Sequence, residues 1–278
     1  MNRDAHLLGG LALSLILASG AAQATLIDRD NGMIYDIDRN ITWVSDANLF
    51  DTLHASDPAL TARVIADVHA VSHGRTTHTL TTADFSTAVA GHQSGLMSWW
   101  GAMACAQDLV FVGFDDWWLP TSLQPDRACS QQSHINANDS DVSQGTGCTG
   151  RELGHLSYDE LGGSANADIR VVHNASCALC SDVRTDDWTG TPFTVSGLGD
   201  ASWSFTPSDG KQRLVESGSG GDGAISFAWI VRSGDVRVTL PPNGVPEPGT
   251  VSLLFAAIGA TSVVGRRWSR LSARKGNY

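Results

Sequence analysis

Two apolar runs at opposite ends of the chain decide which part of it can fold into a globular domain. The first, Leu7–Leu17, follows Arg3 and leads to Ala22-Gln23-Ala24, the small-x-small pattern of a signal-peptidase site. We therefore interpret residues 1–24 as a helical signal peptide whose removal leaves Thr25 as the first residue. The alternative is a buried N-terminal helix.

The second run, Gly249–Gly265, is uncharged and mostly apolar, and Arg266 and Arg267 follow it at once. A membrane-spanning helix needs about 17–25 residues, so this run predicts one short transmembrane helix. The arginines favour a cytoplasmic C-terminus, with Arg266 and Arg267 as the stop-transfer pair and residues 271–278 as a basic cytoplasmic tail. The alternative is an ordinary C-terminal core helix.

The part of the chain between these runs is strongly acidic. The whole chain has a formal charge of −11, but Thr25–Gly265 holds only 12 of the 18 basic residues and 28 of the 29 acidic ones, a formal charge of −16. Such a body repels phosphate backbones, so we expect no nucleic-acid partner. Its carboxylates could hold divalent cations, which makes calcium a candidate ion, although no cofactor is certain.

Residues 25–245 are long enough for one core, and their patterns indicate an α+β domain with short helices, a small antiparallel sheet and long loops. Leu26–Trp43 reads as a β-hairpin or meander, and Asp57-Pro58 begins a helix. Ser98 caps another helix, and Arg151–Leu161 forms a third. The predicted core face of the Asp57 helix carries Leu60, Val64, Val68 and Val71.

The segments that follow read as loop and strand. The polar stretch Cys129–Gly150 predicts a long loop. Pro192–Phe205 and Ala224–Leu240 are strand-like.

The chain has five cysteines, and export to an oxidising compartment favours disulfides. Cys129 and Cys148 flank the polar stretch and are our first choice for a bridge. Cys177 and Cys180 form a C-x-x-C, which we interpret as structural or spare thiols rather than as a redox pair, because no βαβ pattern surrounds it. A single C-x-x-C is also weak evidence for zinc.

No set of residues makes a convincing catalytic centre, so we expect no enzyme. Glu152 and His155 lie three residues apart, a spacing that fits an acid–base pair, a surface pair or a polar anchor in the core. We favour the last two, because no nucleophile or metal motif accompanies the pair. The aspartates between Asp28 and Asp38 miss the spacing of a calcium-binding EF-hand, and turn formation explains them better.

The C-terminal pattern resembles the PEP-CTERM sorting signal over residues 246–270. Pro246-Glu247-Pro248 is followed by the apolar stretch of about 249–265 and then by arginines. The resemblance implies recognition by an exosortase-type enzyme, cleavage near the motif, and a transient inner-membrane anchor. It also implies delivery to the cell surface or exopolysaccharide matrix of a Gram-negative bacterium.

The body, residues 25–245, resembles the Lcl C-terminal-like domain, which is known by a W-R-L-P-T motif. Here Trp117 precedes Trp118-Leu119-Pro120-Thr121, so that Trp118 stands where the family has arginine. Further matches lie at Ile41–Trp43, Glu152–Leu156, Trp188–Thr191 and Ala228–Val236. The resemblance implies a single C-type lectin-like domain, a fold similar to that of sulfatase-modifying factors. It also implies kinship with adhesins that bind sulfated glycans.

Together these patterns predict an exported surface or matrix protein that binds polysaccharide or a matrix protein without catalysis. Its acidity argues against sulfated glycans and favours neutral glycan, calcium-bridged glycan or protein as the ligand. Two alternatives stay open: an enzyme of the formylglycine-generating type, which would need a reactive cysteine pair, and a purely structural matrix protein.

Overall fold

The computed structural model describes residues 26–73, 76–86, 95–136, 139–166, 179–195, 199–217 and 225–236. The chain divides into two units, Met1–Val236 and Arg237–Tyr278, and all the described residues belong to the first. The predicted signal peptide, sorting motif and transmembrane stretch thus lie outside the described residues. Within the described ranges, no helix has the length and apolar character that crossing a bilayer needs.

The first sheet joins the start of the described domain to its end. Its five antiparallel strands stand in the order β1-β2-β3-β14-β8, with the bounds Leu26–Asp28, Met33–Asp36, Ile41–Val44, Val231–Ser233 and Trp117–Trp118. The predicted meander is confirmed as β1 to β3. In β14, Val231 pairs with Trp43 on one side and with Trp118 on the other.

The second sheet also has five antiparallel strands, in the order β11-β12-β13-β10-β9. Their bounds are Asp187–Val195, Gly199–Thr206, Lys211–Glu216, Ser140–Thr146 and Gln131–Ile135. The prediction of a long loop over Cys129–Gly150 is therefore wrong, because β9 and β10 form a hairpin there. Strand β9 is largely exposed, so its sequence lacks the apolar alternation that marks a half-buried strand.

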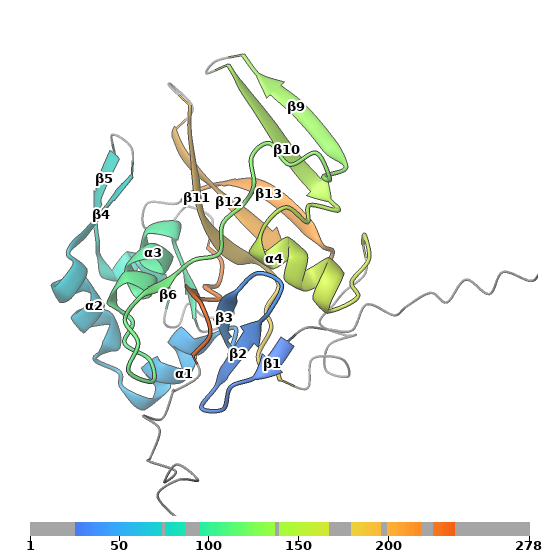
Figure 1. Cartoon of the computed structure of the whole chain (residues 1–278). Coiled ribbons are helices and arrows are strands. Elements are labelled where there is room, and N and C mark those ends of the chain that lie inside the picture. The colour runs from blue at the N-terminus through green and yellow to red at the C-terminus, as the bar shows by residue number, and fades with distance from the viewer. Residues whose placement is uncertain are drawn as a thin grey trace, which may run out of the picture. The chain divides into compact units, whose positions relative to one another are not determined.

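Three α-helices pack together near the first sheet, and Figure 1 shows α1, α2 and α3 on one side of the molecule with the β4–β5 hairpin. Helices α1, α2 and α3 span Leu49–Ser56, Leu60–Val68 and Trp99–Asp108. Strands β4, Ala70–His73, and β5, Thr76–Thr79, form one hairpin. Strands β6, Phe85–Ser86, and β7, Leu96–Met97, pair with each other, and the 3₁₀ turn η1 spans Thr82–Asp84. The remaining helical elements are α4, Glu152–His155, and the π-helix η2, Leu156–Glu160.

Local chemistry explains where these helices begin and end. Ser98 caps α3 as predicted, since its hydroxyl oxygen accepts a hydrogen bond from the Gly101 N–H. Helix α2 ends earlier than the apolar spacing suggests, because His69 adopts a φ of +62° and turns the chain into β4. Val71 is buried as expected, but it lies in β4 and not on the helix.

Tryptophans fill much of the core between the sheets and the helices. Five of them, Trp43, Trp99, Trp188, Trp203 and Trp229, are at most 1% exposed. The rings of Trp43 and Trp229 meet edge to face at 5.3 Å, which ties β3 to the segment before β14. Fully burying a large apolar side chain stabilises a fold by about 1.5–3 kcal/mol, so these rings are major determinants of stability.

Candidate functional site

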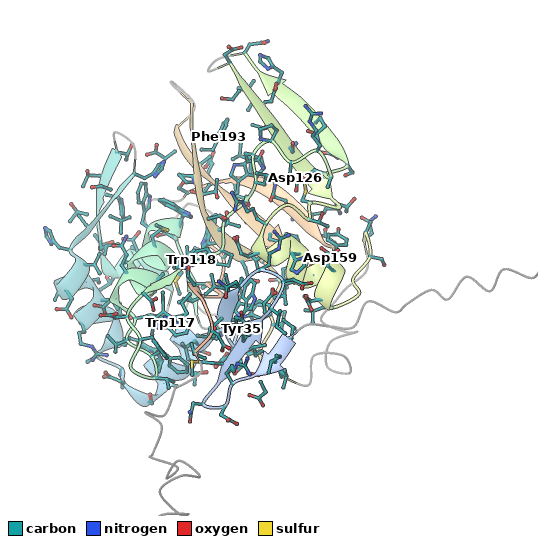
Figure 2. All side chains as sticks on the ribbon, viewed as in Figure 1. Tyr35, Trp117, Trp118, Asp126, Asp159 and Phe193 are labelled. Carbon is teal, nitrogen blue, oxygen red and sulfur yellow. A yellow bond between two sulfur atoms is a disulfide. The ribbon has the colours of Figure 1, made fainter. Side chains whose placement is uncertain are left out.

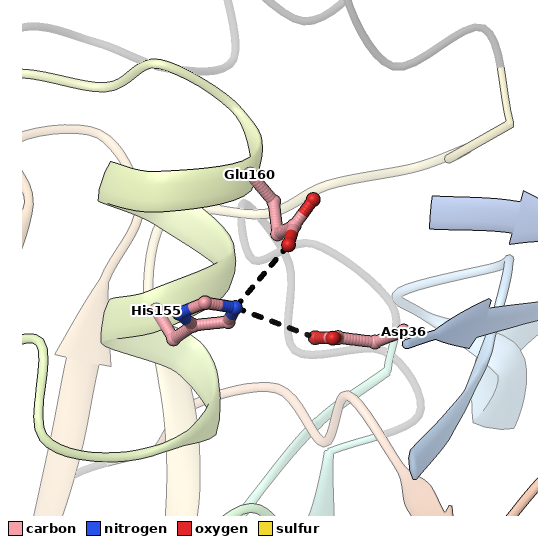
Figure 3. Close-up of side chains that lie close together, drawn as sticks. All are labelled: Asp36, His155 and Glu160. Carbon is pink, nitrogen blue, oxygen red and sulfur yellow. Dashed lines mark ion pairs between the residues drawn. The ribbon is translucent and has the colours of Figure 1, made fainter. Parts of the chain in front are cut away.

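A buried cluster of one histidine and two carboxylates lies where α4 and η2 pack against β2 (Figure 3). His155 Nε2 stands 3.2 Å from Glu160 Oε1 and 3.9 Å from Asp36 Oδ2. All three side chains are at least nine-tenths buried. One potential ligand atom from each lies within 4.8 Å of the other two, so the cluster has the size of a metal centre.

The π-helix brings Glu160 to the same face as His155. Residues five apart in an α-helix point about 140° away from each other. In η2 the Leu161 N–H instead donates to the Leu156 carbonyl, five residues back, and the wider turn aligns such residues. Single π turns in proteins often occur at functional sites.

Asp159 fixes the orientation and tautomer of the His155 ring. Its carboxylate lies 2.8 Å from His155 Nδ1, and because a carboxylate only accepts, Nδ1 must carry the proton. The other ring nitrogen, Nε2, lies on the side of Asp36 and Glu160. Asp159 projects from η2 and is half exposed (Figure 2), so this contact forms the outer side of the cluster.

Asp36 is buried with only one of its carboxylate oxygens hydrogen-bonded. Oδ1 accepts from the backbone N–H of Arg39, whereas Oδ2 and His155 Nε2 have no hydrogen bond of acceptable geometry among the described residues. Burial raises the pKa of Asp36 and so does Glu160, although the Arg39 N–H, His155 and the nearby Trp43 indole N–H lower it in part. The bond from Arg39 agrees with the turn interpretation for Asp36. The bond from Asp30 N–H to the Asp28 carboxylate, earlier in the meander, agrees with it for Asp28.

The contacts of Glu152 fit the favoured interpretation of a polar anchor in the core and not the acid–base alternative, since the described contacts of this buried carboxylate are with Thr121 and not with His155. Glu152 Oε2 accepts from the backbone N–H and the hydroxyl of Thr121, at 2.8 and 2.9 Å. Glu152 is therefore an internal anchor that ties α4 to the W-L-P-T segment, whereas His155 faces Asp36 from the same short helix.

The W-L-P-T segment lies between the two sheets and contacts both of them. Trp118 belongs to β8 and pairs with Val231 in the first sheet. Next to it, the Pro120 carbonyl accepts from the Gly190 N–H of β11 at 2.7 Å. Leu119 is buried, whereas Trp118, which stands where a W-R-L-P-T motif has arginine, is only partly buried. The segment holds the sheets together, as its proline and aromatic residues suggest.

Asp84, His78 and Ser98 are the residue types of a hydrolytic triad, but their hydrogen bonds connect them in a different order. Asp84 stands in the middle, 2.9 Å from His78 Nε2 and 2.8 Å from the Ser98 hydroxyl. Because the carboxylate accepts the serine proton, the histidine is not positioned to activate this hydroxyl. Burial raises the pKa of Asp84, but hydrogen bonds from His78, Thr81 and Ser98 outweigh it and hold this pKa below its usual value. The group caps η1 and α3.

A polar groove of ≈ 390 Å³ runs over the second sheet where β9, β10 and β13 meet. Amide, hydroxyl and cationic side chains line it, among them Gln131, Gln144, Asn166, Lys211 and Arg213. Both cations form ion pairs with the single carboxylate of Asp209, which neutralises one of their two charges. The groove therefore offers many hydrogen-bonding groups and one excess positive charge.

A second, mainly apolar pocket of ≈ 460 Å³ lies between α1, α2 and α3. Phe50, Leu60 and Leu109 contribute apolar surface, and Asp57 and Arg63 form an ion pair among its lining residues. Cys105 also lines it, but this thiol is buried, and burial raises its pKa, which disfavours the reactive thiolate.

The disulfide prediction is confirmed, since Cys129 and Cys148 are bonded and close the chain around the β9–β10 hairpin. Cys180 is also disulfide-bonded, whereas Cys177 lies outside the described residues. The remaining predicted site residues lie there too, namely the sorting motif Pro246, Glu247 and Pro248 and the stop-transfer pair Arg266 and Arg267. Sequence reasoning missed Asp36, Asp159 and Glu160 as partners of His155.

No family model matches the sequence, and no curated protein or solved structure matches it either.

Proposed function

We propose that this chain is an exported protein of a Gram-negative bacterium that is sorted to the cell surface or exopolysaccharide matrix. The observation that carries the proposal is the Cys129–Cys148 disulfide. Disulfides form and persist outside the reducing cytoplasm, which agrees with a cleaved signal peptide over residues 1–24. An exosortase-type enzyme is the proposed sorting partner, acting at Pro246-Glu247-Pro248 while residues 249–265 hold the chain in the inner membrane.

The body is proposed to be an Lcl C-terminal-like domain of the C-type lectin-like type. Its support is the way in which the quoted motif segments meet. Thr121 bonds to Glu152, Pro120 bonds to Gly190, and Trp118 pairs with Val231, so each of these segments contacts W-L-P-T. Residues that resemble a family in this order thus also form one connected unit.

Binding of a neutral polysaccharide, without catalysis, is the proposed role of this domain. The polar groove supports it, because paired amide and hydroxyl groups can hydrogen-bond sugar hydroxyls and Asp209 neutralises one of the two cationic charges. The buried Cys105 thiol, with its raised pKa, makes a poor nucleophile for chemistry of the formylglycine-generating type.

A glycan array tests the ligand. The full chain, purified from the native host, is applied with and without calcium, beside a Gln131→Ala/Gln144→Ala variant. We expect the wild type to bind neutral polysaccharides. We expect the variant to bind them with an affinity at least about tenfold lower, since several hydrogen bonds are lost. Gln107→Ala, an exposed glutamine on α3, is the matched control and retains binding. Equal binding by the groove variant would place the ligand elsewhere.

Fractionation of the native host tests the sorting. Replacing Pro246, Glu247 and Pro248 with alanines removes the two prolines that favour an extended backbone, the form in which a processing enzyme can bind this segment. The variant then accumulates in the inner membrane with its tail intact, while the wild type reaches the surface or medium with a new C-terminus. Unchanged release of the variant with the same C-terminus would defeat this part of the proposal.

A further inference from the structure

Two atoms of the buried cluster, Asp36 Oδ2 and His155 Nε2, have no hydrogen bond among the described residues. Both belong to side chains that are at least nine-tenths buried, so water does not easily satisfy them. A buried polar atom without a hydrogen bond costs free energy, unless an ion binds it. Asp36 forms no ion pair with lysine or arginine among the described residues, so neither of these side chains compensates its charge.

A proton on Nε2 does not satisfy these two atoms well. His155 Nε2 makes no hydrogen bond of acceptable geometry, although Glu160 Oε1 lies 3.2 Å away. Asp36 Oδ2 has no hydrogen bond either and stands 3.9 Å from the same nitrogen. Neither atom therefore has a hydrogen bond, and ligand atoms of the three residues lie within 4.8 Å of one another.

We propose that Asp36 Oδ2, His155 Nε2 and Glu160 Oε1 bind a divalent transition-metal ion, for which zinc is the best fit. Ligand atoms in a tetrahedral zinc site lie about 3.3 Å apart, given metal–ligand bonds of about 2.0–2.2 Å. The separations of 3.2 and 3.9 Å approach this value, and small side-chain rotations would complete it. Two carboxylates also neutralise the charge of a divalent ion.

The donor set selects against calcium, which the acidic composition suggested as a candidate. Calcium takes six to eight oxygen ligands, whereas imidazole nitrogen suits zinc and its neighbours. Asp159 supplies the expected second contact, because histidines that bind metal usually donate their other ring N–H to a carboxylate or carbonyl. Three protein ligands leave a fourth tetrahedral position for water.

The bound ion would cross-link β2, near the start of the domain, to η2. The turn after β2 is also tied to the segment before α4, since the Arg39 guanidinium donates to the Thr149 carbonyl. The metal therefore acts as a clamp between the first sheet and the α4–η2 segment, and its binding free energy adds to the stability of the fold. This inference does not rest on the proposed glycan or sorting function.

Metal binding by the full chain is the first test. Protein produced with its own signal and tail and purified in detergent is stripped with a chelator and titrated calorimetrically with zinc, then with calcium. We expect one zinc per chain, a rise in Tm on binding, and no competition from calcium. Cobalt substituted for zinc gives the visible bands of a tetrahedral site with nitrogen and oxygen ligands. Failure to bind zinc stoichiometrically, or an intense cobalt–thiolate band, would overturn the assignment.

Variants assign the ligands. Asp36→Asn keeps the shape of the side chain and is expected to weaken zinc binding by more than about 100-fold. Asp159→Asn is expected to weaken zinc binding by about 10–100-fold. Because Asp159 is half exposed, this variant should fold even where Asp36→Asn does not. His134→Ala removes a histidine from an exposed pair with Asp141 and is the matched control. Wild-type affinity in Asp159→Asn, or in a folded Asp36→Asn, would refute the site.

Discussion

Gly154 lies so close to the main chain of Cys148 that a larger residue does not fit. A Cβ atom at this position would stand 1.7 Å from the Cys148 carbonyl oxygen, and backbone cannot move aside as a flexible side chain can. Glycine here lets α4 pack directly on the disulfide-bonded segment. The same short helix presents Glu152 to Thr121 and His155 to Asp36, so the close approach sets the position of both side chains.

Gly154→Ala should therefore destabilise the fold. We expect a loss of about 3 kcal/mol in the free energy of unfolding, the upper part of the range for overpacking, because the clash is with backbone. Gly162→Ala is the control, since a Cβ atom at that glycine would meet open space. Its φ of +62° alone disfavours alanine, and we expect a loss of about 1 kcal/mol in the free energy of unfolding. Denaturant unfolding measures both, and equal losses would show that α4 can move away.

Asp187 is a fully buried carboxyl whose two oxygens have no hydrogen-bond partner. Burial raises its pKa well above the usual value, nearby Asp186 raises it further, and Arg184 lowers it only in part. A carboxyl with a raised pKa in the folded state opposes folding when charged. This cost is fully present above the folded-state pKa and declines as the pH falls below it toward the unfolded-state value.

Asp187→Asn should consequently stabilise the protein at neutral pH. The expected gain is about 1–3 kcal/mol, because a neutral amide replaces a carboxylate whose charge is costly to bury without a hydrogen bond. Thermal unfolding measured from pH 8 downward should show the gain shrinking as the wild-type carboxyl takes up its proton. Asp51→Asn, on the partly exposed side of α1, is the control. A gain that does not change with pH would mean that Asp187 is not charged in the folded protein.

At the scale of elements, the π-helix explains why sequence reasoning missed the candidate metal site. The helix over Arg151–Leu161 was predictable from its capping and glycine signals. Which side chains share a face of this helix was not predictable. An α-helical spacing groups Glu152 with His155 and places Glu160 on the opposite side. Only the wider turn of η2 aligns Glu160 with His155. Asp36 comes from strand β2, which is far away in the sequence, so no spacing pattern links it to the other two residues.

The β9–β10 hairpin shows the opposite case, in which the covalent link was predictable and the strands were not. The two cysteines flank a polar stretch, which suggested the bridge. The strands carry polar side chains on both faces, so they show no period-two pattern. The disulfide takes over part of the stabilisation that a buried face would provide in an ordinary hairpin.

Removing the disulfide should therefore lower stability measurably. On the chain-entropy description, closing a loop of this length contributes roughly 3 kcal/mol, and we expect Cys129→Ser/Cys148→Ser to lose about this much. Urea unfolding of the variant and of the oxidised wild type gives the difference. Wild type under reducing conditions is a second measurement that introduces no new side chain. If the variant unfolds at the same urea concentration as the oxidised wild type, the hairpin does not depend on its bridge.

At the scale of the whole molecule, the coarse fold was predictable and the number of sheets was not. The α+β class, the short helices and the Leu26–Trp43 meander follow from turn residues, caps and apolar spacing. The second sheet escaped notice because its strands β9 and β10 are polar. In the first sheet, β14 covers only Val231–Ser233 of the longer run Ala224–Leu240 that was predicted as strand-like. Burial of Trp188, Trp203 and Trp229 agrees with their apolar character, but which strands they join depends on long-range pairing.

Processing at the N-terminus gives a whole-molecule prediction. Cleavage after Ala22-Gln23-Ala24 should leave Thr25 as the first residue of the exported chain. Intact-mass and peptide mapping of the surface fraction from the native host measure this end, and the cytoplasmic precursor serves as the control. Exported material that still begins at Met1 would contradict the prediction.

The pairing of β14 with both β3 and β8 has a consequence for the timing of biosynthesis. A ribosome produces β3 early, where it can pair with β2, and β8 midway. Strand β8 cannot join β3 in the first sheet until Val231–Ser233, which lies between them, emerges near the end of the domain. Until then the nascent chain lacks the strand that joins its two ends, and long-range pairing of this kind forms slowly. The polypeptide thus stays incompletely folded for most of its synthesis, which is the form that a narrow secretion channel can thread.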